Sequence, residues 1–193
     1  MDSKKTKINR KGYSQEKLNS MHKNGYYNYL CSDDFLPVYN FIAETILFEN
    51  ANSVLDVGCW NGIFYKVLNN KGYKSFYLGF DLSESAINEG KKLYGNNNTK
   101  FLTETWDNFQ TDREYHTIYF GGVFYYIDQK INFIEKFIKQ VKPKVIVIQD
   151  LQSTNLSEID KYFEKVETKY FELKMNVNNQ RNLRQVKIIK LKK

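Results

Sequence analysis

The sequence predicts an α/β fold in which a mostly parallel β-sheet carries helices on both of its faces. Short apolar runs alternate along the chain with amphipathic segments, an order typical of parallel strands joined by helices. The last two apolar runs have no long helix between them, which predicts an antiparallel hairpin at one edge of the sheet. With 193 residues, of which 41% are hydrophobic, the chain is long enough for one domain with a substantial core.

The expected helices follow from apolar positions that recur at helical spacing. The first helix is expected at residues 35–48, with Asp33 or Asp34 as its N-cap and Pro37 in its first turn. A helix at 83–94 has Ser83 as its candidate cap. Further helices are expected at residues 63–70, 129–141 and 157–166.

The expected strands are short runs rich in β-branched and aromatic residues. Five of them precede the hairpin, at residues 53–57, 75–80, 99–102, 117–120 and 145–148. The hairpin consists of residues 169–175 and 186–191, joined by a polar loop at 176–184. The sequence therefore predicts a mostly parallel seven-stranded sheet with an antiparallel C-terminal edge hairpin.

The net charge of +7 is concentrated at the two ends of the chain, in residues 4–11 and 187–193. Lys, Asn, Ile and Tyr are abundant throughout, so the charge indicates a general compositional bias more than a nucleic-acid patch. A phosphorylated or nucleotide-linked small ligand would balance this positive charge as well as RNA would. Nucleic acid is therefore a disfavoured partner, although the charge does not exclude it.

The sequence favours a cytoplasmic protein without membrane association. No stretch is apolar for long enough to span a bilayer, and no apolar run follows the basic N-terminus. The two cysteines, Cys31 and Cys59, lack the partners that a disulfide framework or a metal site would need. We therefore expect no metal, and the sequence gives no indication of the oligomeric state.

The main functional signal lies between the first strand and the helix after it, where the sequence reads Asp56-x-Gly58-x-x-x-Gly62. In open parallel sheets, ligands bind beyond the carboxyl ends of the strands. Gly58 allows the backbone to turn, and Gly62 allows helix and ligand to approach closely. Asp81 ends the next strand, about 20 residues after the glycine turn, where a cofactor's ribose hydroxyls are held.

The same segment argues against other nucleotide-binding motifs. The dinucleotide pattern Gly-x-Gly-x-x-Gly is absent, and no Gly-Lys-Ser/Thr phosphate loop occurs. A carboxylate at Asp56 would repel a pyrophosphate but suits a cationic ligand. The pattern therefore favours a nucleoside cofactor with positive charge and without phosphates.

These features resemble the class I S-adenosylmethionine-dependent methyltransferases. The Asp56-x-Gly58-x-x-x-Gly62 segment resembles their first motif, Asp/Glu-x-Gly-x-Gly-x-Gly, with Trp60 in place of the middle glycine. Asp81 resembles their ribose-binding acid. Residues 101–106 resemble the segment that flanks adenine, with Thr105 where an acid is usual, and residues 116–127 resemble the fourth strand and its loop.

The resemblance covers residues 54–191. It implies a Rossmann-like methyltransferase domain at 49–193, preceded at 1–48 by a tail and a helical lid segment, and S-adenosylmethionine as the cofactor. The implied cofactor-binding residues are Asp56, Gly58, Cys59, Gly62, Asp81, Leu82, Thr105, Trp106 and Gly121.

Candidate acceptor-binding and catalytic residues follow from their places in this arrangement. His22, Tyr26 and Tyr29 of the lid segment are expected to bind the acceptor, with core packing as the alternative for the tyrosines. Tyr125 and Tyr126 are candidate catalytic residues, because a phenol there could orient or deprotonate a nucleophile; the alternative is packing over the cofactor. Asp150 could accept a proton or bind a hydroxyl, or it could cap a helix.

The expected function is methyl transfer to an oxygen or nitrogen of a small polar metabolite, such as a sugar, amine or carboxylate. Two alternatives stay open: an RNA methyltransferase, favoured only by the charge, and a non-catalytic relative that binds S-adenosylmethionine. Methyl transfer depends mainly on alignment and on a dry site. We therefore expect the tyrosine-rich N-terminal segment to close over the acceptor.

Overall fold

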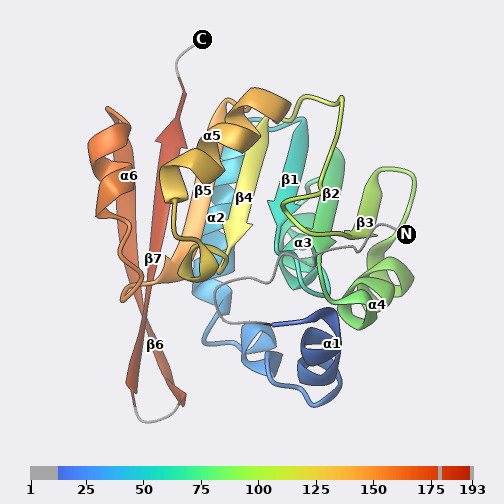
Figure 1. Ribbon diagram of the computed structural model, residues 1–193. Helices are drawn as coiled ribbons and strands as arrows, with labels where there is room; N and C mark the ends of the chain where they lie inside the picture. The colour runs from blue at the N-terminus through green and yellow to red at the C-terminus, as the bar shows by residue number, and fades with distance from the viewer. Residues whose placement is uncertain (1–12, 178–179, 192–193) are drawn as a thin grey trace, which may run out of the picture.

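The computed structural model describes residues 13–177 and 180–191. It contains a seven-stranded sheet in the order β3-β2-β1-β4-β5-β7-β6, in which β1 to β5 are parallel and β7 is antiparallel to both of its neighbours. The strands are β1 (Ser53–Val57), β2 (Phe76–Asp81), β3 (Thr99–Thr103), β4 (Thr117–Gly121), β5 (Val145–Leu151), β6 (Val166–Val177) and β7 (Gln180–Lys190). The predicted fold class is confirmed (Figure 1).

Helices cover both faces of the sheet, as predicted. They are α1 (Gln15–Lys23), α2 (Leu36–Phe48), α3 (Ile63–Asn70), α4 (Glu84–Tyr94), α5 (Lys130–Val141) and α6 (Ser157–Tyr162), with short 3₁₀ helices η1 (Asn28–Cys31) and η2 (Phe124–Tyr126). Ser83 caps α4, since its Oγ accepts a hydrogen bond from the Ala86 N–H at 3.4 Å. Pro37 lies in the first turn of α2, as expected.

Side chains alternate between two cores because successive residues of a strand point to opposite faces. On one face, Val54 of β1 packs with apolar residues of α2 and α3. On the other face, Leu55 packs with residues of α5 and α6. All five residues of β1 are buried, as expected for a parallel strand covered by helices on both faces.

The chain order creates a switch point between β1 and β4. From β1 the chain builds β2 and β3 on one side, and it then returns to build β4 and β5 on the other. The carboxyl ends of these parallel strands lie together at one end of the sheet. Figure 1 shows α1 lying across these strand ends, below β1 and β2. A ligand site is expected at such a place.

Helix α1 lies in the expected lid segment, but the apolar periodicity of the sequence did not identify it. Met21 is its only fully buried residue, so the apolar stripe that marks an amphipathic helix is almost absent. Its start is defined by a polar contact: Ser14 Oγ accepts a hydrogen bond from the Lys17 N–H at 3.3 Å.

Three local predictions were wrong. The helix expected at 157–166 ends at Tyr162, and β6 begins at Val166. The loop expected at 176–184 is mostly strand, because antiparallel pairing continues through its polar residues; Arg184, for example, pairs with Phe171 and with Leu151. The N-cap of α2 is Phe35, without a side-chain cap bond, so neither Asp33 nor Asp34 fills that role.

Candidate active site

A cavity of about 500 Å³ opens beyond the carboxyl ends of the parallel strands. Its walls come from β1, β2, β4 and β5, from the N-terminal segment and from β7. Most of the predicted site residues line it: Tyr26, Tyr29, Asp56, Gly58, Cys59, Asp81, Leu82, Thr105, Trp106, Gly121, Tyr125, Tyr126 and Asp150. Two of the predicted residues, His22 and Gly62, lie outside this lining.

The turn after β1 contains three residues in the left-handed backbone region, namely Gly58, Trp60 and Gly62. A Cβ atom on Gly58 would lie 2.5 Å from the Val123 side chain, so this glycine allows the loop after β4 to pack closely against the turn at the cavity. A Cβ atom on Gly62 would lie 2.7 Å from the Phe101 ring. Gly62 therefore allows α3 to pack against β3, whereas Gly58 lines the cavity itself.

Asp81 holds this turn in place from the end of β2. Its two carboxylate oxygens accept hydrogen bonds from the Trp60 N–H at 3.0 Å and from the Ser83 N–H at 2.8 Å. Each carboxylate oxygen has a second lone pair, so both can still accept from ligand hydroxyls. Burial raises the pKa of Asp81, and the backbone hydrogen bonds from Ser83 and Trp60 oppose that rise.

Asp56 is a buried acid of the cavity, with an exposed fraction of 1%. Its Oδ2 accepts a 2.5 Å hydrogen bond from the Tyr77 hydroxyl, while its Oδ1 is buried and has no hydrogen-bond partner in the described part of the chain. Burial raises the pKa of Asp56 from 3.8 to about 7, with the Tyr77 hydrogen bond opposing the rise and the charge of Asp81 adding to it. A bound cation would supply the missing partner and favour the ionised form.

The end of β3 brings Thr105 and Trp106 to the cavity. Thr105 Oγ1 accepts a hydrogen bond from the Asn108 N–H at 3.2 Å, and its own N–H donates to Glu104 Oε1 at 2.8 Å. Glu104 and Asp107 also line the cavity, although the sequence analysis did not select them. Carboxylates therefore lie on either side of Thr105 in the sequence, and its role beside adenine stays a prediction.

Tyr126 lies where the N-terminal segment meets the loop after β4. Its hydroxyl is 3.4 Å from the Tyr27 hydroxyl. Burial raises the pKa of Tyr126 to about 12, and burial also raises the pKa of Tyr27. Both phenols are therefore protonated at neutral pH, which suits them to orient a ligand more than to remove a proton from it. Tyr125 is 41% exposed at the mouth of the cavity.

Asp150 is buried at the end of β5 and accepts several local hydrogen bonds. Oδ1 accepts from the Leu151 N–H at 2.7 Å and from Thr154 Oγ1 at 2.8 Å, and Oδ2 accepts from the Tyr125 N–H at 3.1 Å. These bonds fix the loops after β4 and β5. Asp150 does not cap α6, the helix that follows β5, because the N-cap of α6 is Leu156 without a side-chain cap bond. A catalytic role for Asp150 stays a prediction.

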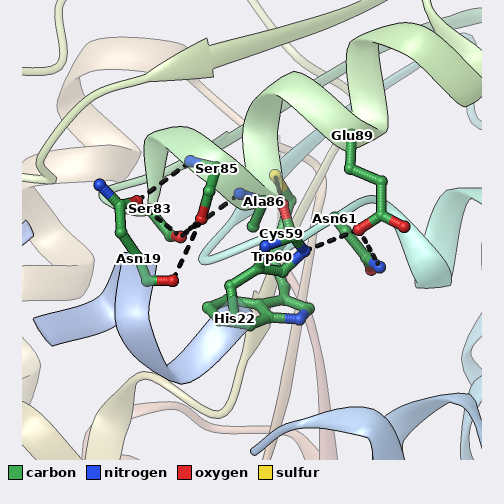
Figure 2. Close-up of polar contacts among 9 residues, drawn as sticks. All are labelled: Asn19, His22, Cys59, Trp60, Asn61, Ser83, Ser85, Ala86 and Glu89. Carbon is green, nitrogen blue, oxygen red and sulfur yellow. Dashed lines mark hydrogen bonds and ion pairs between the residues drawn. The ribbon is translucent and has the colours of Figure 1, made fainter. Parts of the chain in front are cut away.

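His22 anchors α1 to α4. Its Nε2 lies 2.7 Å from Glu89 Oε2, and its ring packs edge-on against Trp60 with centroids 5.1 Å apart (Figure 2). Asn19 makes a second anchor, because its Oδ1 accepts from the Ser85 N–H at 3.0 Å in the first turn of α4. The Trp60 ring also meets Tyr27, at 4.7 Å between centroids. Trp60 therefore connects the turn after β1 to the N-terminal segment.

Two further polar residues of the cavity were missed by the sequence analysis. Gln149 directly precedes the selected Asp150, and Arg184 fell within the segment expected to be a polar loop. Both are buried, with exposed fractions of 3% and 6%. A continuous strand prediction through residue 184 would have placed this arginine beside β5.

Comparison with known proteins identifies the family. A family model described as a methyltransferase domain matches residues 26–186. The chain belongs to this family. The resemblance to S-adenosylmethionine-dependent methyltransferases is thereby confirmed, and so is S-adenosylmethionine as the cofactor of the family. The cavity beyond β1 and β2 is the candidate active site of this methyltransferase domain.

Individual relatives are distant. Malonyl-(acyl-carrier protein) O-methyltransferase 2 of Ilyobacter polytropus is 26% identical over 101 residues, which cover 52% of this chain and 39% of that protein. The plantazolicin methyltransferase BpumL, solved in complex with S-adenosylhomocysteine, has a TM-score of 0.66 at 18% identity, covering 92% of this chain and 91% of that one. The methyltransferase domain of bacterial CtHen1-C has a TM-score of 0.61 at 14% identity, covering 83% of this chain and 100% of that one. These structures support the Rossmann-like fold.

Within the described residues, no helix combines the length and the apolar character that crossing a bilayer would require.

The basic C-terminal end is partly neutralised inside the fold. Lys187 is buried and its Nζ donates to both carboxylate oxygens of Asp160, at 2.7 and 2.9 Å. Lys190 forms a 2.6 Å ion pair with Glu49. Lys187 and Lys190 are therefore each paired with a carboxylate, and neither of them offers an open anion-binding patch.

Proposed function

We propose that this methyltransferase domain transfers the methyl group of S-adenosylmethionine to an oxygen or nitrogen of a small polar acceptor. The observation that carries the proposal is a single cavity lined both by the acids Asp56 and Asp81 and by tyrosines that include Tyr27 and Tyr126. The volume of about 500 Å³ falls within the range of small-molecule sites. The acceptor would be enclosed between the N-terminal segment and the loops after β4 and β5.

The residues present fit the cofactor. The unpartnered Oδ1 of Asp56 suits a cationic group, and the free lone pairs of Asp81 suit the ribose hydroxyls. Gly58, in the left-handed backbone region, allows the turn after β1 to pack closely against Val123 beside the cavity. S-adenosylmethionine supplies an activated methyl group, so the protein mainly has to position the acceptor and exclude water. Tyr27 and Tyr126 would orient the acceptor by hydrogen bonding.

The experiment is a calorimetric titration with S-adenosylmethionine and S-adenosylhomocysteine, followed by a turnover screen with a methyl-labelled donor. We expect binding of both nucleosides and methyl transfer to at least one class among sugars, amines and carboxylates. Absence of binding at millimolar nucleoside would contradict the proposal. Binding without turnover on any acceptor would favour the non-catalytic relative, and a salt-dependent shift of added RNA would favour the RNA methyltransferase.

We further propose that the part of the predicted lid segment 1–48 that precedes α2 acts as a lid on the rest of the domain, whereas α2 itself packs in the core against residues 49–193. The N-terminal segment contributes Tyr13, Leu18, Tyr26, Tyr27 and Tyr29 to the cavity wall. The anchors of Asn19 and His22 on α4 hold this wall in place. Removing the wall would open the acceptor chamber to water and leave the two acids at β1 and β2 unchanged.

Deletion of residues 1–30 is therefore expected to lower turnover far more than cofactor affinity. We expect kcat/KM to fall by about 100-fold or more, since alignment and water exclusion contribute several kcal/mol. The measurements are steady-state kinetics and calorimetry with S-adenosylhomocysteine. The double variant Asn19→Ala/His22→Ala, which keeps the whole chain, should show the same pattern to a smaller degree. Equal losses of turnover and affinity would argue against a lid.

A further inference from the structure

We infer that Arg184, together with Gln149, forms a subsite that binds a carboxylate of the methyl acceptor. This inference rests on the proposed function and adds an anionic group to the acceptor. Arg184 lies on β7 and Gln149 on β5, and both side chains line the cavity. The sheet register pairs Leu151 with Arg184 and Gln149 with Val186, which makes Gln149 and Arg184 diagonal neighbours on the same face.

Both side chains carry a buried donor without a partner. Arg184 is 6% exposed and Gln149 is 3% exposed. Among the described residues, neither the Nε of Arg184 nor the Nε2 of Gln149 has a hydrogen-bond partner. A buried donor is costly when it has no acceptor, so a ligand oxygen that accepts from both donors would stabilise this arrangement. The planar guanidinium matches the two oxygens of a carboxylate, and the amide adds a further donor.

Asp150 does not supply a hydrogen-bond acceptor to the arginine, although burial raises the pKa of Asp150 and the charge of Arg184 opposes that rise. The oxygens of Asp150 already accept hydrogen bonds from Leu151, Thr154 and Tyr125. The guanidinium instead lies over aromatic rings, with its Cζ 5.7 Å from the Tyr29 centroid and 5.3 Å from the Phe35 centroid. These rings shield the charge from water without supplying an acceptor atom.

The strand order separates this subsite from the residues that fit the cofactor. Asp81 lies on β2, and Arg184 lies on β7, four strand spacings away. At about 4.8 Å per spacing, the two strands are roughly 19 Å apart across the sheet. Arg184 is therefore on the side of the cavity left for the acceptor. Along one face of the sheet the cavity runs from the anionic Asp56 on β1 to the cationic Arg184 on β7, which suits a cationic cofactor and an anionic acceptor.

The test uses phenylacetate as the probe, because the subsite combines an arginine with aromatic rings, and uses phenylacetamide as its neutral isostere. Both are titrated into the full chain by NMR in the presence and absence of saturating S-adenosylhomocysteine. We expect phenylacetate to bind more tightly than phenylacetamide. Arg184→Gln should weaken phenylacetate binding at least tenfold and leave phenylacetamide binding unchanged. Arg184→Lys, which keeps the charge but loses the planar fork, should give an intermediate affinity.

The control is Arg113→Gln, which removes the same charge from an exposed position over the Phe76 ring, and it should not change the affinity for phenylacetate. Affinity for S-adenosylhomocysteine should stay within about threefold in Arg184→Gln. Equal binding of acid and amide would overturn the inference. So would a loss of nucleoside affinity as large as the loss of phenylacetate affinity, because Arg184 would then serve the cofactor. If the unaltered chain bound no nucleoside, the proposed function would fail, while the titration without nucleoside would still test the carboxylate subsite.

Discussion

Asp81→Asn is expected to weaken S-adenosylmethionine binding by about 10- to 100-fold. A hydrogen bond to a charged group contributes about 1.5–3 kcal/mol, and about 1.4 kcal/mol corresponds to a factor of ten. The substitution removes the negative charge of the carboxylate that would accept hydrogen bonds from the ribose hydroxyls. It also replaces one of the oxygens that hold the Trp60 and Ser83 N–H groups with an amide donor. The turn that carries Gly58 should therefore loosen as the affinity falls.

The measurement is calorimetry of Asp81→Asn with S-adenosylmethionine and with S-adenosylhomocysteine. Because both nucleosides carry the same ribose, we expect similar losses for the two. Asp112→Asn is the matched control, since it makes the same charge change at an exposed position outside the cavity lining. An affinity of Asp81→Asn within twofold of the unaltered chain would contradict the assignment of Asp81 to the ribose.

Asp56→Asn is expected to stabilise the ligand-free protein at alkaline pH while weakening cofactor binding. Burial raises the pKa of Asp56 to about 7 in the folded protein, from an ordinary value of 3.8. The folded state therefore retains a proton that the unfolded chain releases. The stabilisation from this group is fully present below about pH 4 and is lost as the pH rises through 7. Above that pH the folded protein contains a buried charge whose Oδ1 has no described partner.

An asparagine at this position keeps an oxygen for the Tyr77 hydroxyl and removes the charge. We expect the melting temperature of Asp56→Asn to exceed that of the unaltered chain at pH 8 and the difference to shrink toward pH 5. Each kcal/mol regained corresponds to about 2–4 °C for a protein of this size. Thermal unfolding across this pH range measures the effect, and a difference that does not change with pH would contradict it.

The same substitution should lower the affinity for S-adenosylmethionine by about tenfold, because the cationic ligand loses its buried anionic partner. S-adenosylhomocysteine lacks the sulfonium charge, so its affinity should fall less. The ratio of the two affinities is the informative measurement. Equal losses for both nucleosides would place Asp56 away from the sulfonium.

The sequence by itself determined most of the strands and helices, in their order along the chain, and the location of the two acids proposed to bind the cofactor. These features are local: apolar periodicity marks the elements, and Asp56, Gly58 and Asp81 stand at fixed distances from strand ends. The parallel arrangement then brings the strand ends together, so both acids line the same cavity. Local patterns were sufficient wherever a residue's place follows from the end of its own strand.

Only the tertiary structure decided the features that depend on contacts between distant segments. Helix α1 buries a single residue and is anchored through Asn19 and His22 to α4, so it has no apolar pattern of its own to detect. The polar residues around Arg184 become strand through pairing with β5 and β6. The elevated pKa of Asp56 arises from burial that only the packed sheet provides. In each case the cause is long-range packing, which overrides local propensity and cannot be read from neighbouring residues.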